Sequence, residues 1–129
     1  MLSSASVDGL NARLTARGEA PVGSERFRPN LVLDGLQAHE EDWIDRITLD
    51  GPDGPVVLRL VKPCSRCSIP DVDPARGEPD HAVGAELAGY RADARLNGKV
   101  TFGMNAIVED GIERRLSIGT RGHATIRFD

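Results

Sequence analysis

Residues 55–67 read Pro-Val-Val-Leu-Arg-Leu-Val-Lys-Pro-Cys-Ser-Arg-Cys, and they predict both the main strand and the main site of the chain. The apolar run at the start predicts a strand. Ile47-Thr48-Leu49, followed by turn residues 50–54, predicts its hairpin partner. Both cysteines of the chain, Cys64 and Cys67, follow the second strand directly. The hairpin therefore leads into a short turn that holds both thiols.

Several other segments predict strands. Residues 100–108 are the clearest case, because alternate residues are apolar and share one face, with Asn105 on the other face. Residues 31–33 predict a short buried strand, and residues 124–128 predict a last strand. Residues 112–118 offer a strand that returns from the turn before them.

Helices and one loop complete the expected elements. Apolar residues recur at helical spacing over about 6–17, where Ser6 is available as N-cap, and again over about 82–92. Residues 68–79 are dense in proline, aspartate and glycine, so we expect a loop there, in which Asp73-Pro74 forms an Asx turn.

The composition is that of one soluble globular domain. The chain has 129 residues, of which 40% are hydrophobic and 28% charged, and fourteen glycines and eight prolines against five aromatics favour strands and turns. A net charge of −4 and a pI near 5.4 argue against a nucleic-acid partner. No apolar run approaches the roughly 20 residues of a membrane span and the N-terminus has no signal-peptide pattern, so we expect a cytoplasmic protein that is not in a membrane.

Residues 40–43 read Glu-Glu-Asp-Trp, three acids ahead of the only tryptophan. We expect a solvated turn in which Trp43 packs as a local anchor. A metal site made of the carboxylates is the alternative. It is less favoured, because three adjacent side chains point in different directions and the sequence offers no evident partner ligands.

Two thiols in one turn fit four kinds of site. A zinc site needs four ligands, but the chain has no second cysteine pair, and His39, His81 and His123 lack ligand spacing. A thioredoxin-like pair precedes a helix, whereas Ile69-Pro70 follows here, and a disulfide is not expected to persist in a reducing cytosol. In the fourth kind of site, one thiolate ligates a soft metal of a larger cofactor and Arg66 helps to stabilise the anion.

Short motifs along almost the whole chain occur in the order and approximate spacing of one family. The chain resembles the MOSC domain, named for the C-terminal domain of molybdenum cofactor sulfurase, a family that includes the mitochondrial amidoxime-reducing component and bacterial YcbX-like proteins. The motifs are Arg26-Phe27-Arg28-Pro29-Asn30, the acidic segment with Trp43, residues 62–67, Val72-Asp73-Pro74 with Gly77, Phe102-Gly103-Met104-Asn105, and Ile118-Gly119.

The resemblance implies a mainly β, β-barrel-like domain with two short peripheral helices that binds a molybdopterin-type molybdenum cofactor. Cys67 matches the ligand to molybdenum at the catalytic centre, whereas Cys64 is expected to be a packed residue. Arg28 and Asn30 match positions that hold the pterin phosphate and neighbouring cofactor atoms. Ser65 matches a further cofactor contact, and Asn105 falls at a cofactor-side position. These side chains suit such roles, because an arginine fork matches phosphate oxygens and an asparagine amide both donates and accepts.

The resemblance also implies a function, with alternatives. The first is an oxidoreductase that reduces N-hydroxylated compounds with electrons from an external flavin or haem protein. The second is a sulfur carrier that holds a persulfide on Cys67 and is loaded by a cysteine desulfurase. The third is a non-catalytic unit completed by a partner chain. Members of the reducing branch carry a long portion before the segment matching residues 6–17, so we expect residues 1–129 to be a single, N-terminally shortened MOSC domain.

Overall fold

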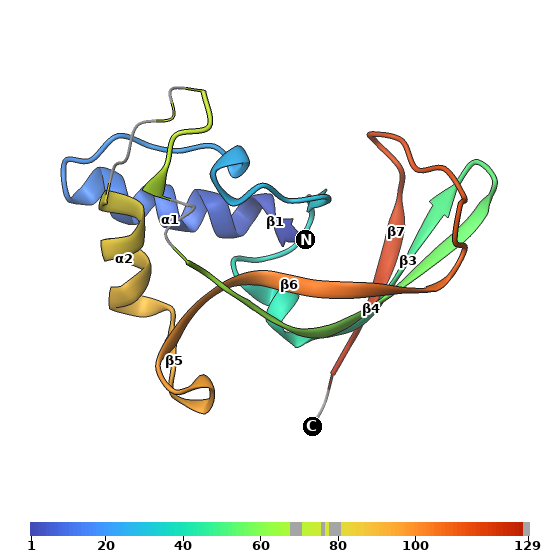
Figure 1. Cartoon of the computed structure of the whole chain (residues 1–129). Coiled ribbons are helices and arrows are strands. Elements are labelled where there is room, and N and C mark those ends of the chain that lie inside the picture. Colours follow the sequence, from blue (N-terminus) through green and yellow to red (C-terminus); the bar gives the residue numbers. More distant parts are fainter. Residues whose placement is uncertain (68–70, 76, 78–80, 128–129) are drawn as a thin grey trace.

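The computed structural model describes residues 1–67, 71–75, 77 and 81–127, which form a curved antiparallel sheet with two helices at one end (Figure 1). The prediction of a mainly β domain with two short helices is confirmed. In this part of the chain the sheet is open rather than closed into a barrel, with β5 and β7 at its edges. Its strand order is β5 (Ala92–Asp93), β6 (Lys99–Asp110), β4 (Gly54–Ser65), β3 (Ile44–Gly51) and β7 (Gly122–Ile126).

The predicted hairpin is formed by β3 and β4. Gly51 pairs with Gly54 across the turn, and Gly54 has a φ of +120°, a backbone conformation open chiefly to glycine. Farther along the ladder Ile47 pairs with Leu58, and both side chains are buried. Cross-strand apolar pairs of this kind stabilise a sheet, and they hold β4 in place up to Ser65, where the cysteine turn begins.

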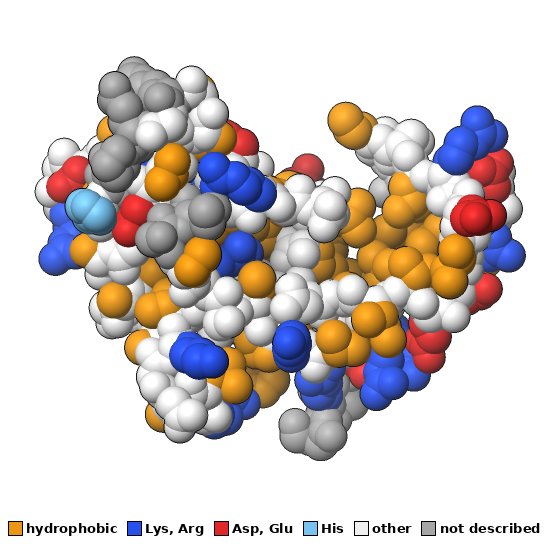
Figure 2. All heavy atoms as spheres, in the orientation of Figure 1, with side chains coloured by type: hydrophobic (Ala, Val, Ile, Leu, Met, Phe, Trp, Pro, Cys, Tyr) orange, Lys and Arg blue, Asp and Glu red, His pale blue; other side chains and the backbone are white. Residues whose placement is uncertain are grey.

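Two hydrophobic clusters form the core, and β6 contributes to both. Phe102 lies in the cluster between the helices and the adjacent end of the sheet, and Met104 lies in the cluster on the sheet. The apolar face predicted for residues 100–108 is therefore confirmed at these two positions. Val108, at the far end, is 44% exposed. Figure 2 shows further hydrophobic side chains on the hollowed face in front of β3, β4 and β7.

The first helix, α1 (Ser4–Ala16), begins earlier than predicted. Ser3 is its N-cap, because the Ser3 hydroxyl oxygen accepts from the Ser6 backbone N–H at 3.1 Å. The prediction that Ser6 caps this helix was wrong. Ser6 lies inside the helix, and its hydroxyl donates to Glu41 Oε1 at 2.7 Å. The second helix, α2 (Ala82–Tyr90), matches its prediction. Neither α1 nor α2 has the length and apolar character required to cross a membrane, nor does any other helix in the described part of the chain.

The acidic segment forms a 3-10 turn, η2 (Glu40–Trp43), with the opposite burial from that predicted. Glu41 is fully buried, and Trp43 is 56% exposed. Glu41 accepts from the Ser3 backbone N–H at 3.1 Å and from the Ser3 hydroxyl at 3.0 Å, in addition to Ser6. A carboxylate is favoured here because the first turn of α1 leaves unpaired N–H groups and a partial positive charge.

Three other predictions have mixed outcomes. β2 (Val32–Leu33) exists and pairs in parallel with β1 (Leu2–Ser3), but Val32 is 45% exposed rather than buried. The returning strand predicted over residues 112–118 is not formed. The next strand along the chain is β7, which pairs with β3. The Asx turn is confirmed, because the Asp73 carboxylate accepts from the Ala75 N–H at 2.9 Å. Residues 68–70, 76 and 78–79 of the predicted loop lie outside the described residues.

Candidate functional site

The end of β4 presents the two cysteines differently. Both are free thiols, with Cys64 half-buried and Cys67 exposed. Cys64 Sγ makes one weak contact, at 3.9 Å from the Ser65 carbonyl oxygen. Cys67 is therefore the more accessible of the two cysteines to an external group.

Arg66, between the two cysteines, joins the turn to two distant segments. Its Nε and Nη2 donate to the Phe102 carbonyl oxygen at 2.9 and 2.6 Å, and its Nη1 donates to the Phe27 carbonyl oxygen at 3.2 Å. The rings of Phe27 and Phe102 stack on each other with centroids 4.2 Å apart. One guanidinium thus holds together the cysteine turn, the loop of residues 26–30 and the start of β6.

Gly103 makes this close approach possible. Its φ is +79°, and a Cβ at this position would lie 2.6 Å from the Met1 carbonyl oxygen and 3.3 Å from Arg66 Nη2. Both the backbone conformation and the lack of space favour glycine. The Phe102-Gly103 motif therefore serves the packing beneath the turn.

The charge of Arg66 acts on the turn through space. Burial lowers the pKa of the guanidinium, and Cys64 and Cys67 raise it. From the sequence, Arg66 was predicted to stabilise a thiolate. Its guanidinium donates to the backbone carbonyls of Phe27 and Phe102 instead, so any effect on the sulfur is Coulombic. The role of Arg66 as a clamp was not predicted, since carbonyl acceptors have no sequence signature.

The loop of residues 26–30 places Arg28 and Asn30 at the surface. Arg28 follows the 3-10 turn η1 (Ser24–Phe27) and adopts the left-handed conformation, with φ 48° and ψ 51°. Both Arg28 and Asn30 are exposed. Because the preceding Phe27 carbonyl is bound by Arg66, the base of this loop is fixed relative to the cysteine turn.

Ser65 and Asn105 lie at different points of the β4–β6 ladder. Ser65 is exposed and pairs with Thr101, whereas Asn105 is half-buried and pairs with Lys62. Ser65 is therefore part of the turn, and Asn105 lies three ladder residues away, about 10 Å along a regular strand. The structure places Ser65 beside Cys67 and sets Asn105 farther along the sheet.

The predicted residues suit a molybdenum cofactor by their chemistry. Cys67 offers an exposed sulfur, which is a soft metal ligand, and Arg28 offers an exposed guanidinium for phosphate. Ser65 and Asn105 add a hydroxyl and an amide, which orient polar groups of a ligand. The donor set therefore fits a soft metal carried by an anionic organic group.

Comparison with known proteins assigns the family. The sequence profile of the MOSC domain matches residues 1–121. This chain belongs to the MOSC domain family. The mitochondrial amidoxime-reducing component 1 of Homo sapiens is 35% identical over 116 residues, which are 85% of this chain and 32% of that protein.

Other MOSC relatives include longer proteins. Molybdenum cofactor sulfurase of Solanum lycopersicum is 33% identical over 113 residues, 81% of this chain and 13% of that protein. Mitochondrial amidoxime reducing component 2 of Rattus norvegicus is 38% identical over 92 residues, 70% of this chain and 25% of that protein. This MOSC chain thus spans a third or less of the length of these three relatives.

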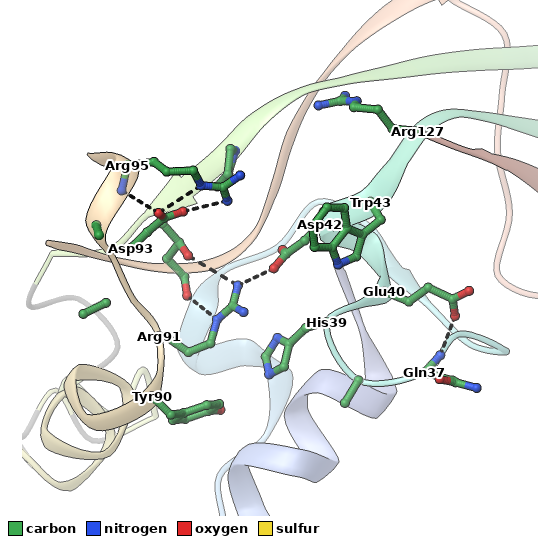
Figure 3. A pocket seen from close by; sticks show the side chains of 15 residues that line it. Gln37, His39, Glu40, Asp42, Trp43, Tyr90, Arg91, Asp93, Arg95 and Arg127 are labelled. Carbon is green, nitrogen blue, oxygen red and sulfur yellow. Dashed lines mark hydrogen bonds and ion pairs between the residues drawn. The ribbon is translucent and has the colours of Figure 1, made fainter. Parts of the chain in front are cut away.

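A further pocket of about 660 Å³ is lined by neither cysteine (Figure 3). Its walls come from residues 37–40, 42–43 and 90–95, with Pro63, Thr101 and Arg127. None of the five predicted site residues lines it. This pocket was not predicted from the sequence, because residues 40–43 were expected to form a solvated turn and His39 was considered only as a zinc ligand.

Proposed function

We propose that this MOSC domain binds a molybdenum cofactor through the Cys67 thiolate. The observation that carries the proposal is the exposed, free Cys67 in a turn that Arg66 ties to the loop of Arg28 and Asn30. The chain's relatedness to a molybdenum cofactor sulfurase supports the same cofactor class.

The chain's own residues would hold and orient the group. Cys67 would ligate the metal, Arg28 would pair with the pterin phosphate, and Asn30, Ser65 and Asn105 would contact neighbouring polar atoms. When bound, such a cofactor supplies the redox chemistry, and the protein contributes ligation, orientation and electrostatics. Arg66 would act as a positioning residue, because its hydrogen bonds hold the segments that carry these contacts.

We further propose that the domain belongs to an oxidoreductase that reduces N-hydroxylated compounds. Identities of 35 and 38% to amidoxime-reducing components support this reaction class. The electrons would come from an external flavin or haem protein. We also propose a cytoplasmic location, which rests on the sequence alone. The open sheet favours completion of the domain by further residues.

Metal and pterin analysis tests cofactor binding. The protein, expressed in a host that makes the cofactor, is expected to carry molybdenum and pterin in near-equal amounts. Cys67→Ser should lose most of the molybdenum, whereas the matched Cys64→Ser variant should retain it. A parent protein without either component, or equal loss in both variants, contradicts the proposal.

The exposure of Cys67 also favours a second function, transfer of sulfur as a persulfide. The thiolate would attack the outer sulfur of a desulfurase persulfide, form the new S–S bond and release the donor thiolate. Mass spectrometry after incubation with a cysteine desulfurase and cysteine should then show one added sulfur atom on Cys67. The absence of an adduct, or an equal adduct on Cys64, contradicts the carrier role.

A further inference from the structure

Three buried polar atoms in the pocket of Figure 3 have no hydrogen-bond partner within the protein. They are His39 Nδ1, Asp42 Oδ1 and Tyr90 Oη. Among the described residues these are all the buried side-chain atoms in that condition, and all three residues line the same pocket. Buried polar groups in native proteins are almost always paired, so such a concentration indicates a binding site.

The pocket holds its Asp42 carboxylate in a fixed position. Arg91 Nη2 donates to Asp42 Oδ2 at 2.8 Å, while Arg91 Nε donates to the Thr101 carbonyl oxygen at 2.9 Å. The Asp42 side chain is 22% exposed and that of Arg91 is 13% exposed. Oδ1 of the same carboxylate is thus left as an acceptor for a ligand N–H group (Figure 3).

The other two groups supply complementary hydrogen bonds. Burial raises the pKa of Tyr90, so its phenol keeps a proton to donate, although Arg13 and Arg91 oppose this shift. Burial and the charge of Arg91 lower the pKa of His39, despite the opposing carboxylates of Glu41 and Asp42, so the imidazole is neutral near pH 7. The pocket therefore offers an acceptor, a donor and a neutral imidazole nitrogen.

The charges and the exposed aromatic ring of the pocket restrict the class of ligand that it can bind. Arg95 pairs with Asp93 at 3.0 Å, and Arg127 donates to the Leu60 carbonyl oxygen at 2.8 Å, so both cations are already engaged. A carboxylate acceptor disfavours an anion, and the adjacent Arg91 disfavours a metal cation. Trp43 is 56% exposed beside Asp42 (Figure 3) and offers an aromatic face for stacking.

We propose that this pocket binds a neutral, planar nitrogen heterocycle of the nucleobase class. Its N–H group donates to Asp42 Oδ1, its carbonyl or ring nitrogen accepts from the Tyr90 hydroxyl, and its face stacks on Trp43. The lining of this pocket includes neither cysteine and none of the predicted cofactor contacts, so ligand binding here is tested without a cofactor at Cys67.

Calorimetry or ligand-observed NMR tests the proposal with the full chain and four nucleosides: adenosine, guanosine, cytidine and uridine. Ribose alone is the ligand control. We expect at least one nucleoside to bind with a Kd between about 10 μM and 1 mM, and ribose not to bind. No saturable binding by any nucleoside, or equal binding of ribose, overturns the proposal.

Two variants identify the site. Tyr90→Phe removes only a hydroxyl that has no protein partner, so it should weaken binding about fivefold and leave the unfolding midpoint unchanged. Trp43→Ala should weaken binding about tenfold through lost stacking. Ile118→Ala, which truncates an exposed hydrophobic residue outside the pocket, should change nothing. Parent-like binding by Tyr90→Phe, with its fold intact, overturns the assignment.

Discussion

Arg66 donates two hydrogen bonds to the single carbonyl oxygen of Phe102, from Nε at 2.9 Å and from Nη2 at 2.6 Å. The two residues are 36 apart in the chain, and the contact fixes the cysteine turn on β6. The exposed side of that turn is thus free to present Cys67, while its inner side is anchored by the half-buried Arg66.

Replacement of Arg66 by lysine should weaken this anchor. An ammonium keeps the charge but cannot reach both carbonyl oxygens with a planar fork. We expect the free energy of unfolding in urea to fall by about 1–2 kcal/mol, because at least one hydrogen bond is lost. Arg59→Lys, at an exposed β4 position, is the matched control and should change it by less than about 0.5 kcal/mol. Equal effects in the two variants argue against the clamp.

Glu41→Gln should destabilise the start of α1. The buried carboxylate accepts from Ser3 and Ser6, and a neutral amide places a donor against those donors. We expect a loss of about 2 kcal/mol in the free energy of unfolding. Glu19→Gln makes the same charge change at an exposed position and should have little effect. If both variants unfold at the parent's urea midpoint, Glu41 does not stabilise the helix.

His39 should make stability depend on pH. Its pKa in the folded protein is lowered from 6.5, so below that pH the unfolded chain takes up a proton that the folded chain resists. The free energy of unfolding should therefore fall as the pH decreases from about 7 to 5. His39→Gln should flatten this slope, measured by urea unfolding across the range. His123→Gln, at an exposed position, should retain the parent slope, and a parent-like slope in His39→Gln contradicts the prediction.

Gly103→Ala should be strongly destabilising. The new Cβ would lie 2.6 Å from the Met1 carbonyl oxygen at a φ of +79°, so the backbone must shift. We expect a loss of about 1–3 kcal/mol in thermal or urea unfolding. Gly89→Ala is the contrasting control: it lies in α2 with nothing within 4 Å, and alanine there should stabilise the helix by up to about 1 kcal/mol. Two equal changes would mean that Gly103 is not under steric constraint.

The two thiols should differ in reactivity. Cys67 is exposed and Cys64 is half-buried. In single-cysteine variants, Cys64→Ser should react with an aromatic disulfide reagent faster than Cys67→Ser, because it keeps the accessible sulfur. Absorbance of the released thiol gives both rates under native conditions. Full unfolding in urea should bring the rates together, and equal native rates contradict the structural difference.

Part of the fold followed from the sequence because its signals are local. Alternation in residues 100–108 and the turn at 50–54 predicted β6 and the β3–β4 hairpin, and helical spacing predicted α2. The errors arose where distant groups compete with a local pattern. Ser6 has the chemistry of an N-cap, but the buried Glu41, 35 residues away, takes its hydroxyl while Ser3 caps the helix.

The sequence alone was enough to identify the motif around Cys64 and Cys67 and the resemblance to the MOSC domain, since both depend on residue identity and order. Only the tertiary structure determined that Cys67 is the more exposed cysteine and that Arg66 clamps Phe27 and Phe102. It alone brought His39, Asp42 and Tyr90 into one pocket. The physical reason is that burial and backbone carbonyl partners depend on contacts between distant segments, and every residue carries the same carbonyl group.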